Sequence, residues 1–125
     1  MKRCLRAAML VSAMTLALLS GGSRAAEIPI ITGEHWTKSS AEVKKAYLLG
    51  FANTIQIELA YQGKTPVSDA QSAVSRVASG MKGHTLDSVR EVLDKWYAAN
   101  SDRLQRPVIE TIWFEMVVPG LQKTK

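Results

Sequence analysis

The chain has 125 residues, with 16 Lys and Arg against 11 Asp and Glu, a formal net charge of +5 at pH 7. Four of the basic residues and none of the acidic ones precede residue 26, so residues 26–125 carry a net charge of only +1. This balance, with Lys44 and Lys45 as the one adjacent basic pair after residue 25, excludes the basic stripe of a nucleic-acid-binding protein. Cys4 is the single cysteine, which excludes disulfides, thiolate metal sites and a thiol nucleophile from residues 26–125.

Residues 1–25 follow the order of a secretory signal peptide: a basic start, an apolar run over residues 7–20, and small residues before a cleavage point after Ala25. The apolar run of about 14 residues is shorter than the roughly 20 that a permanent transmembrane helix needs, so no permanent membrane anchor is expected. The sequence therefore predicts a periplasmic or secreted protein of bacterial type. Residues 26–125 are long enough for a single domain.

Residues 26–37 are predicted to form an extended lead-in whose isoleucines lie over the domain. Ser39 and Glu42 then stand in capping-box order, which predicts a first helix over about residues 40–61. Gly50, in the middle of this helix, predicts close contact with another helix, because glycine otherwise destabilises a helix interior. The predicted inner row of this helix consists of Val43, Tyr47, Phe51 and Ile55.

A shorter second helix is predicted over residues 68–81, with Ser68 in the capping position and a thin apolar face of small residues. Thr85 is predicted to cap a third helix over residues 86–99, whose apolar residues follow the helical repeat closely.

A polar connector, residues 100–106, leads to Pro107, which suits the first turn of a helix. Residues 108–118 match a helical stripe, although their β-branched content would also suit a strand. We predict a helix that ends at Pro119 and Gly120. The whole pattern predicts an all-α fold, a compact bundle of about four helices in one domain, residues 26–125, after a cleaved signal peptide, residues 1–25.

No group of residues in the sequence predicts catalysis. The only histidines, His35 and His84, have no carboxylates nearby at metal-ligand spacing, and no serine lies in a nucleophile-elbow motif. Glu110 and Glu115 face different sides of the last predicted helix, so they do not form an acid–base pair. We therefore expect no enzyme activity, no metal site and no cofactor; the alternative is that Met81 and His84 together bind a soft metal such as Cu(I).

Two aromatic residues lie outside the predicted helical stripes. Trp36 precedes the first helix, and Phe114 is offset from the apolar face of the last one. Either suits an exposed anchor at a protein interface, with His35 beside the tryptophan, although core packing is the commoner role, and Trp36 against the first helix is its simple case. The candidate partner-binding residues are Trp36, Phe114 and His35.

Two stretches resemble known bacterial proteins. Gly-Glu-His-Trp at residues 33–36 and Lys-Lys-Ala-Tyr-Leu-Leu-Gly-Phe at residues 44–51 are similar to the opening of type VI secretion amidase-immunity proteins. Residues 85–100, with Pro107 and Ile-Trp-Phe at residues 112–114, resemble exported bacterial proteins of unknown function. The immunity proteins usually carry paired cysteines, which residues 26–125 lack, so no inhibitory residue is carried over. The resemblance implies an all-α envelope protein that binds another protein.

The expected function is therefore non-catalytic binding of a protein partner in the cell envelope, including inhibition of it as an immunity factor does. The alternative is a carrier of a small ligand or metal in the envelope. A carrier would have a cavity between the first helix and the region of Trp96 and Trp113, or a site where Met81 and His84 meet. The sequence identifies neither the partner nor the oligomeric state.

Overall fold

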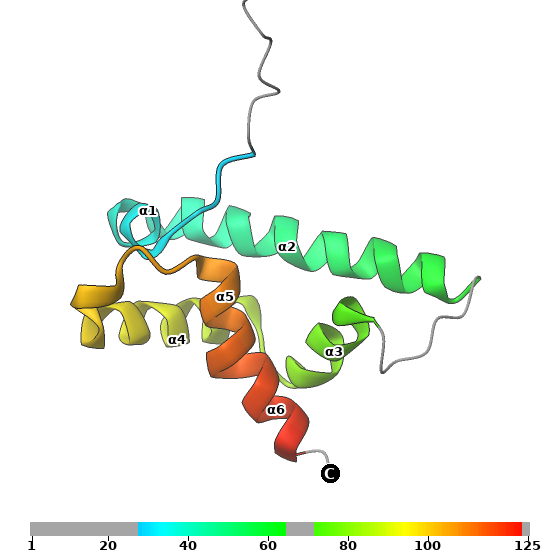
Figure 1. Ribbon diagram of the computed structural model, residues 1–125. Helices are drawn as coiled ribbons and strands as arrows, with labels where there is room; N and C mark the ends of the chain where they lie inside the picture. Colours follow the sequence, from blue (N-terminus) through cyan, green and yellow to red (C-terminus); the bar gives the residue numbers. More distant parts are fainter. Residues whose placement is uncertain (1–27, 65–71, 124–125) are drawn as a thin grey trace, which may run out of the picture.

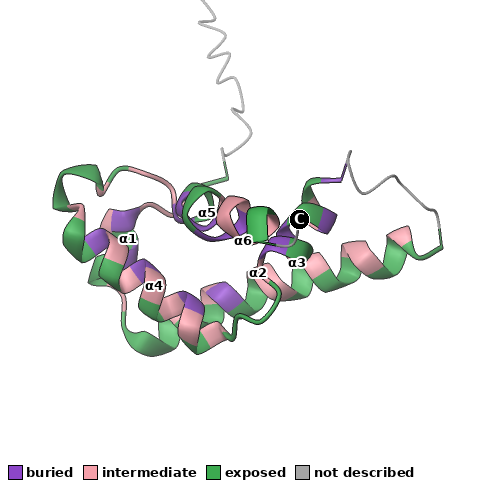
Figure 2. Ribbon diagram, turned by 90° about the horizontal axis from the view of Figure 1, so that it is seen from below, coloured by how far each residue is buried: buried purple, intermediate pink, exposed green. Residues whose placement is uncertain are grey.

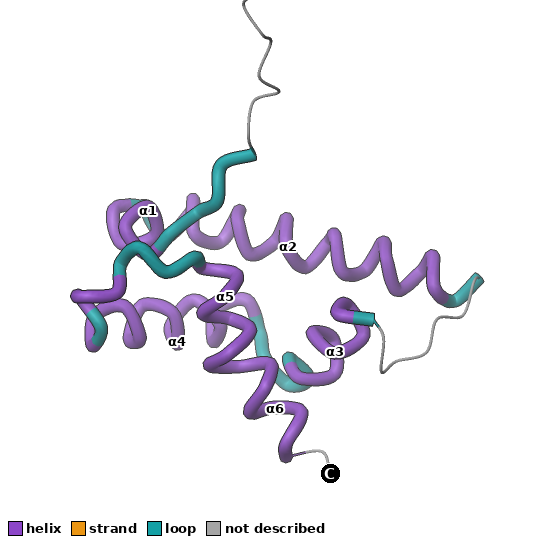
Figure 3. Tube along the Cα trace, viewed as in Figure 1, coloured by secondary structure: helices purple, strands orange, loops and turns teal. Residues whose placement is uncertain are grey.

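The computed structural model of the protein describes residues 28–64 and 72–123, so the predicted signal peptide lies outside the described residues. Figures 1 and 3 show that the described residues form helices and loops, with one isolated bridge between Thr32 and Pro107 and no longer strand. The all-α prediction is confirmed. In chain order the elements are α1 (Gly33–Lys38), α2 (Ala41–Gln62), α3 (Ala73–Gly80), α4 (Leu86–Ala99), η1 (Ser101–Arg103), α5 (Val108–Ile112), η2 (Trp113–Val117) and α6 (Val118–Lys123).

The long helix α2 runs along one side of the molecule, with α3, α4, α5 and α6 on the other side of it (Figure 1). Its bounds agree with the predicted helix to within a residue. The cap is Ser40 and not Ser39: the Ser40 hydroxyl accepts a hydrogen bond of 3.3 Å from the Val43 N–H. The Ser39 hydroxyl instead donates to the His35 carbonyl oxygen at the end of α1.

The segment before α2 was predicted to be extended, and this was wrong from Gly33 onward, where α1 forms. Of the isoleucines expected to cover the domain, Ile28 and Ile30 are 86% and 60% exposed, and only Ile31 packs against the core. Contacts distant in sequence hold α1 in place, since the Gly33 N–H donates to the Arg106 carbonyl oxygen at 3.1 Å. A local sequence pattern cannot encode such contacts.

The core lies where α1, α2, α4 and the C-terminal helices meet, and Figure 2 shows its buried residues on the sides of the helices that face one another. The predicted helix 86–99 is confirmed as α4, and the Thr85 hydroxyl caps it by accepting from the Ser88 N–H at 3.1 Å. The buried core residues are Trp36, Leu48, Val77, Val89, Leu93, Tyr97, Val108, Ile112, Met116 and Val117.

Helix α3 ends at Gly80, one residue before the predicted end. Within the described residues it begins at Ala73, with Ser72 as the cap; the predicted cap Ser68 lies outside them. The Gln62 side chain joins the end of α2 to the start of α3, because its Nε2 donates to the Ser72 hydroxyl at 2.7 Å and its Oε1 accepts from the Ser75 hydroxyl at 2.9 Å.

The C-terminal segment is helical, which decides between the helix and strand alternatives, but the predicted stop at Pro119 and Gly120 is wrong. Helix α5, the π-helical turn η2 and α6 follow one another without a break to Lys123. Pro119, which has no N–H to donate, directly follows the π-helical turn η2, where the Val118 N–H bonds to the Trp113 carbonyl oxygen five residues back instead of four.

Gly50 was predicted to lie in close contact with another helix, and this was wrong; Gly80 and Gly120 make such contacts instead. A Cβ added to Gly50 would have no atom within 4 Å. A Cβ on Gly80 would collide with the Val117 backbone, and one on Gly120 would collide with the Gly80 backbone. The close approach therefore joins α3 to η2 and α6, and α2 takes no part in it.

Candidate functional site

An apolar groove opens between α2, α3 and the C-terminal helices. We call it the α2–α5 groove; its volume is about 380 Å³, and its lining is almost entirely apolar. Ile109 and Phe114, 42% and 52% exposed, lie on its C-terminal wall. The lining residues are Phe51, Thr54 and Ile55 from α2, Ala73, Val74 and Val77 from α3, and Ile109, Glu110, Ile112, Trp113, Phe114 and Val117 from α5 and η2.

The π-helical turn η2 places the two aromatic residues of this wall. It covers Trp113–Val117, and a π turn contains more residues per turn than an α-helix, which shifts the register of side chains on the helix surface. Val117 and Met116 are thereby buried while Phe114 stays exposed. Wide turns of this kind recur at functional sites.

The Arg106 side chain supports Phe114 from outside the groove. Its guanidinium lies 5.5 Å from the centre of the Phe114 ring and 4.8 Å from the centre of the Trp96 ring. It also forms ion pairs with Glu110 at 3.3 Å and Glu115 at 2.9 Å, although its buried Nε is not aligned for a hydrogen bond. A guanidinium that two carboxylates hold over the Phe114 ring favours the observed position of that ring.

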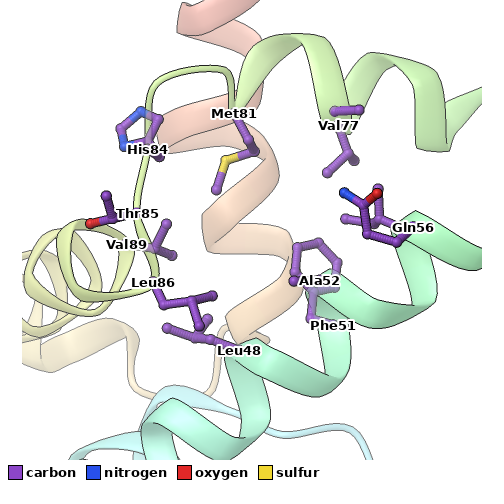
Figure 4. A pocket seen from close by; sticks show the side chains of 12 residues that line it. Leu48, Phe51, Ala52, Gln56, Val77, Met81, His84, Thr85, Leu86 and Val89 are labelled. Atoms are coloured by element: carbon purple, nitrogen blue, oxygen red, sulfur yellow. The ribbon is translucent and has the colours of Figure 1, made fainter. Parts of the chain in front are cut away.

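A second cavity, the α2–α4 pocket, has a volume of about 230 Å³ and lies on the other side of Phe51, Ile55 and Val77, which line both cavities. Met81 and His84 both line it, as the metal-carrier alternative requires. Figure 4 shows the Met81 side chain extending into the pocket, whereas the His84 ring lies at the rim and points away from it.

Of the predicted partner-binding residues, only Phe114 lines the groove. Trp36 is 1% exposed, so its prediction as an exposed anchor is corrected and the alternative role in the core is the one observed. Its Nε1–H donates to Asp94 Oδ1 at 2.8 Å, and its ring meets the Tyr47 ring edge to face at 6.2 Å. Burying the indole is favourable because the Asp94 carboxylate satisfies its one polar group.

His35 is exposed but already has a local partner. Its Nδ1 accepts a hydrogen bond of 3.2 Å from the Thr32 N–H and lies 2.9 Å from the Thr32 hydroxyl, so the ring caps the first turn of α1. The structure places His35 in α1 and Phe114 in η2, and His35 lines neither cavity.

The ionisable groups with shifted pKa values lie outside both cavities. Burial raises the pKa of the Tyr47 and Tyr97 hydroxyls. Hydrogen bonds from Lys38 and Gln105 lower the pKa of Glu34, and hydrogen bonds from its own backbone and from Ser40 lower that of Glu42. None of the four lines the groove or the pocket, so their shifts reflect the packing of the fold.

Glu110 is the one ionisable side chain that lines the groove, and Arg106 is paired with it. Over residues 28–64 and 72–123, no three His, Cys, Asp or Glu side chains lie together as a metal site would require. The groove can therefore take up an apolar group by excluding water from it, with Phe114 and Ile109 at the contact.

Sequence reasoning missed the groove itself. Ile109 belongs to residues 108–118, which were predicted to form a helix with an apolar stripe, yet it is 42% exposed. The offset of Phe114 from that stripe was the only signal that named a residue of the groove. The α2 and α3 walls depend on how the helices pack, which the helical repeat does not specify.

No protein-family model, curated protein or solved structure matches this chain. The resemblance to amidase-immunity proteins stays a prediction. Among the helices within the described ranges, none is both long and apolar enough to cross a membrane.

Proposed function

We propose that this protein is a non-catalytic binding protein of the bacterial periplasm or extracellular space that binds another protein through the α2–α5 groove. The observation that carries the proposal is Phe114, which is 52% exposed beside an apolar groove of about 380 Å³. Exposed aromatic residues held rigidly at the edge of an apolar cavity are characteristic of the residues that dominate protein interfaces.

The surroundings of Phe114 support a protein partner. Arg106, Glu110 and Glu115 form a charged cluster next to the apolar wall, which is the arrangement of an interface with an apolar centre and a polar rim. Because Arg106 already holds the ring, binding requires little further ordering of this side chain. An apolar side chain of the partner would enter the groove and contact Phe114 and Ile109.

The location and the role as an inhibitor or immunity factor are further parts of the proposal. The N-terminal order of basic, apolar and small residues supports export. The similarity of residues 33–36 and 44–51 to amidase-immunity proteins supports an inhibitory role toward an envelope enzyme. Under this proposal the groove takes up part of the inhibited protein.

The second candidate is a carrier of a small apolar ligand, and the groove volume favours it. About 380 Å³ lies within the range of small-molecule sites, and the position between α2 and Trp113 agrees with the cavity expected for a carrier. The almost complete lack of polar lining favours a hydrocarbon chain or ring over a metal ion in this groove.

The deciding experiment uses the protein produced from its full-length gene and immobilised as bait for the native envelope fraction. We expect one stoichiometric protein that the Phe114→Ala variant captures at least about tenfold less well. Ile30→Ala is the matched control, because Ile30 is a large apolar residue that is 60% exposed before α1 and does not line the groove.

Equal capture by wild type and Phe114→Ala, or no captured protein, would contradict the proposal. Mass spectrometry of an organic extract of the purified protein then tests the carrier. A copurified apolar molecule lost on Phe114→Ala substitution would support the second candidate.

A further inference from the structure

The side of α2 that faces away from the other helices carries no charge for most of its length. Lys45 and Glu58 are the nearest charged residues on either side of a 12-residue uncharged stretch, residues 46–57. Figure 1 shows α3 to α6 on one side of α2, and Figure 2 shows exposed residues along its length. A surface helix normally places charged residues on the face that meets water.

Large apolar side chains are exposed on this side. Leu49 is 49% exposed, Ile57 73%, Val43 56% and Tyr61 60%. Gly50 lies among them with open space above it, although glycine destabilises a helix interior. Neither the exposed apolar residues nor the glycine has a role in the packing of the described residues, which indicates that another surface covers them.

The residues on this face are arranged symmetrically about Asn53, with small, then large apolar residues on each side and opposite charges at the two ends. Seven exposed positions lie within about 40° of Asn53 around the helix axis, at 100° per residue, and their spacing is four, three, four, four, three and four residues. Gly63, with φ −58° and ψ −25°, continues the helical path to the last of them. We call this surface the α2 outer face: Glu42, Ala46, Leu49, Asn53, Ile57, Ala60 and Lys64.

This order makes the face complementary to itself. Two antiparallel copies related by a two-fold axis at Asn53 would place Glu42 of one copy opposite Lys64 of the other, at both ends of the contact. Ala46 would lie opposite Ala60, and Leu49 opposite Ile57. Neither Glu42 nor Lys64 has an ion pair within the part of the chain that the structure describes. Each surface of a two-fold interface must match itself in this way.

We propose that the protein forms a homodimer in which the α2 outer faces of two copies pack antiparallel about Asn53. The same symmetry places Gln56 of one copy opposite the open space at Gly50 of the other. Val43 then lies opposite Gly63, and Tyr61 opposite Lys45, at the edges of the contact. The paired Asn53 amides fix the register, as a single polar residue does in a coiled coil.

A second copy explains the face better than an unrelated partner does. An unrelated partner requires an apolar surface but not one whose residues pair across its own midpoint. The opposite charges at the two ends, four residues beyond Ala46 and Ala60, make the antiparallel arrangement favourable and a parallel one unfavourable. The small residues Ala46, Gly50 and Ala60 allow the two helices to approach closely.

The first test is chemical cross-linking at the two-fold axis. In a Cys4→Ser background, Asn53→Cys should form a disulfide-linked dimer on mild oxidation, because the two thiols lie across the axis. Lys95→Cys, exposed on α4, is the matched control and should stay monomeric. Equal cross-linking of both variants, or none at position 53, would overturn the proposal.

The second test exchanges the end charges, with the dimer dissociation constant measured by analytical ultracentrifugation of the protein from its full-length gene. We expect a micromolar dissociation constant for wild type, since one helix face is a small interface. Glu42→Lys and Lys64→Glu, each alone, should weaken dimerisation about tenfold through like-charge contacts. An equimolar mixture of the two variants should dimerise as wild type does, because every contact in the mixed dimer joins opposite charges.

Ile57→Glu should weaken the dimer at least about thirtyfold while leaving the helical circular dichroism unchanged, because Ile57 is 73% exposed in the single chain. A wild-type protein that stays monomeric at high concentration would refute the homodimer and leave the face to a different occupant. If neither the charge exchange nor Ile57→Glu changes the dimer dissociation constant, the interface lies on another surface and the proposal is contradicted.

These outcomes are independent of the α2–α5 groove. Phe114→Ala should leave the dimer dissociation constant unchanged, whereas Ile57→Glu should leave the groove intact, because Ile57 does not line it. Failure of either proposal can therefore be recognised without the other.

Discussion

Helices α4 and α2 both begin with a hydroxyl cap, but only the sequence of α4 indicates which of its faces is buried. Helix α4 carries charged residues along the side that meets solvent, and its buried residues Val89, Leu93 and Tyr97 fall on the opposite stripe. Helix α2 lacks such charges in its middle, and there Leu48 is 1% exposed while its neighbour Leu49 is 49% exposed. In α4 the charged residues indicate from the sequence which face meets solvent. In α2 the exposed face is determined only by where the other helices pack.

The largest effect is expected where α1, α2 and α4 are joined, at Trp36. Asp94 of α4 accepts hydrogen bonds of 2.8 Å from the Trp36 indole and the Lys44 ammonium, and Lys44 lies over the Trp36 ring. Trp36→Ala should lower the free energy of unfolding by about 4 kcal/mol, because it leaves a large cavity. Urea unfolding followed by circular dichroism measures this.

Trp36→Phe is the control, since it keeps most of the buried ring. It should lose much less stability than Trp36→Ala, with a contribution of about 1 kcal/mol from the lost hydrogen bond to Asp94. A Trp36→Ala variant as stable as wild type would mean that the start of α2 is held to α4 by other contacts.

The second prediction compares two adjacent leucines of α2. Leu48→Ala should cost about 3 kcal/mol of unfolding free energy, because Leu48 is 1% exposed and its removal leaves a cavity. Leu49→Ala should change it by less than about 0.5 kcal/mol, as surface substitutions do. Both are measured at protein concentrations below the dimer dissociation constant, where Leu49 meets only water. Similar losses for both leucines would contradict the burial seen in α2.

The helices themselves were largely predictable from the sequence, because local signals mark them. The predicted caps at Thr85, which is confirmed, and at Ser39, one residue before the observed cap Ser40, gave the bounds of α2 and α4 to within a residue. The lead-in was wrong because Gly33 is held by Arg106, 73 positions further along the chain. The stop at Pro119 was wrong because a π-helical turn, η2, directly precedes the proline and the helix continues through it, which a proline–glycine turn signal does not reveal.

The third prediction compares two helical glycines. Substitution by alanine should lower the free energy of unfolding at one and raise it at the other. Gly80→Ala should destabilise the protein by about 2 kcal/mol, because the new Cβ would collide with the Val117 backbone. Gly50→Ala should stabilise the single chain by up to about 1 kcal/mol, since nothing lies within 4 Å of the new Cβ and alanine favours the helix.

Thermal unfolding of dilute protein checks both signs. The homodimer adds a second readout, because Gly50→Ala narrows the space expected for Gln56 of the other copy and should weaken dimerisation. A destabilising Gly50→Ala in dilute protein would show that its surroundings are more crowded than the structure has them.

The candidate site was predictable only at one residue. Phe114, singled out by its offset from the apolar stripe, is exposed and lines the groove, but Trp36, chosen by similar reasoning, is buried. Position relative to a helical stripe cannot separate the two, because α1, which buries Trp36, was not expected. The groove walls from α2 and α3 follow from tertiary packing, and in α2 no charge pattern indicated which side would form them.

The smallest effect is expected at Glu34, on the exposed side of α1. Hydrogen bonds from Lys38 at 2.7 Å and Gln105 at 3.0 Å hold the pKa of the Glu34 carboxyl below its ordinary value of 4.5. A carboxyl with a lowered pKa in the folded state stabilises the protein above the pKa of the unfolded chain. That stabilisation is lost as the pH falls below about 4.5 and through the folded pKa.

Lys38→Met should therefore raise the pKa of Glu34 toward its ordinary value, as followed by NMR titration of its carboxyl carbon. The melting temperature should become slightly less sensitive to acid than that of wild type, because the folded and unfolded pKa values then differ less. The carboxyl is exposed, so the change in stability is small, and the pKa is the sharper readout. An unchanged Glu34 pKa in this variant would mean that Gln105, which joins α1 to the connector after η1, is the dominant partner.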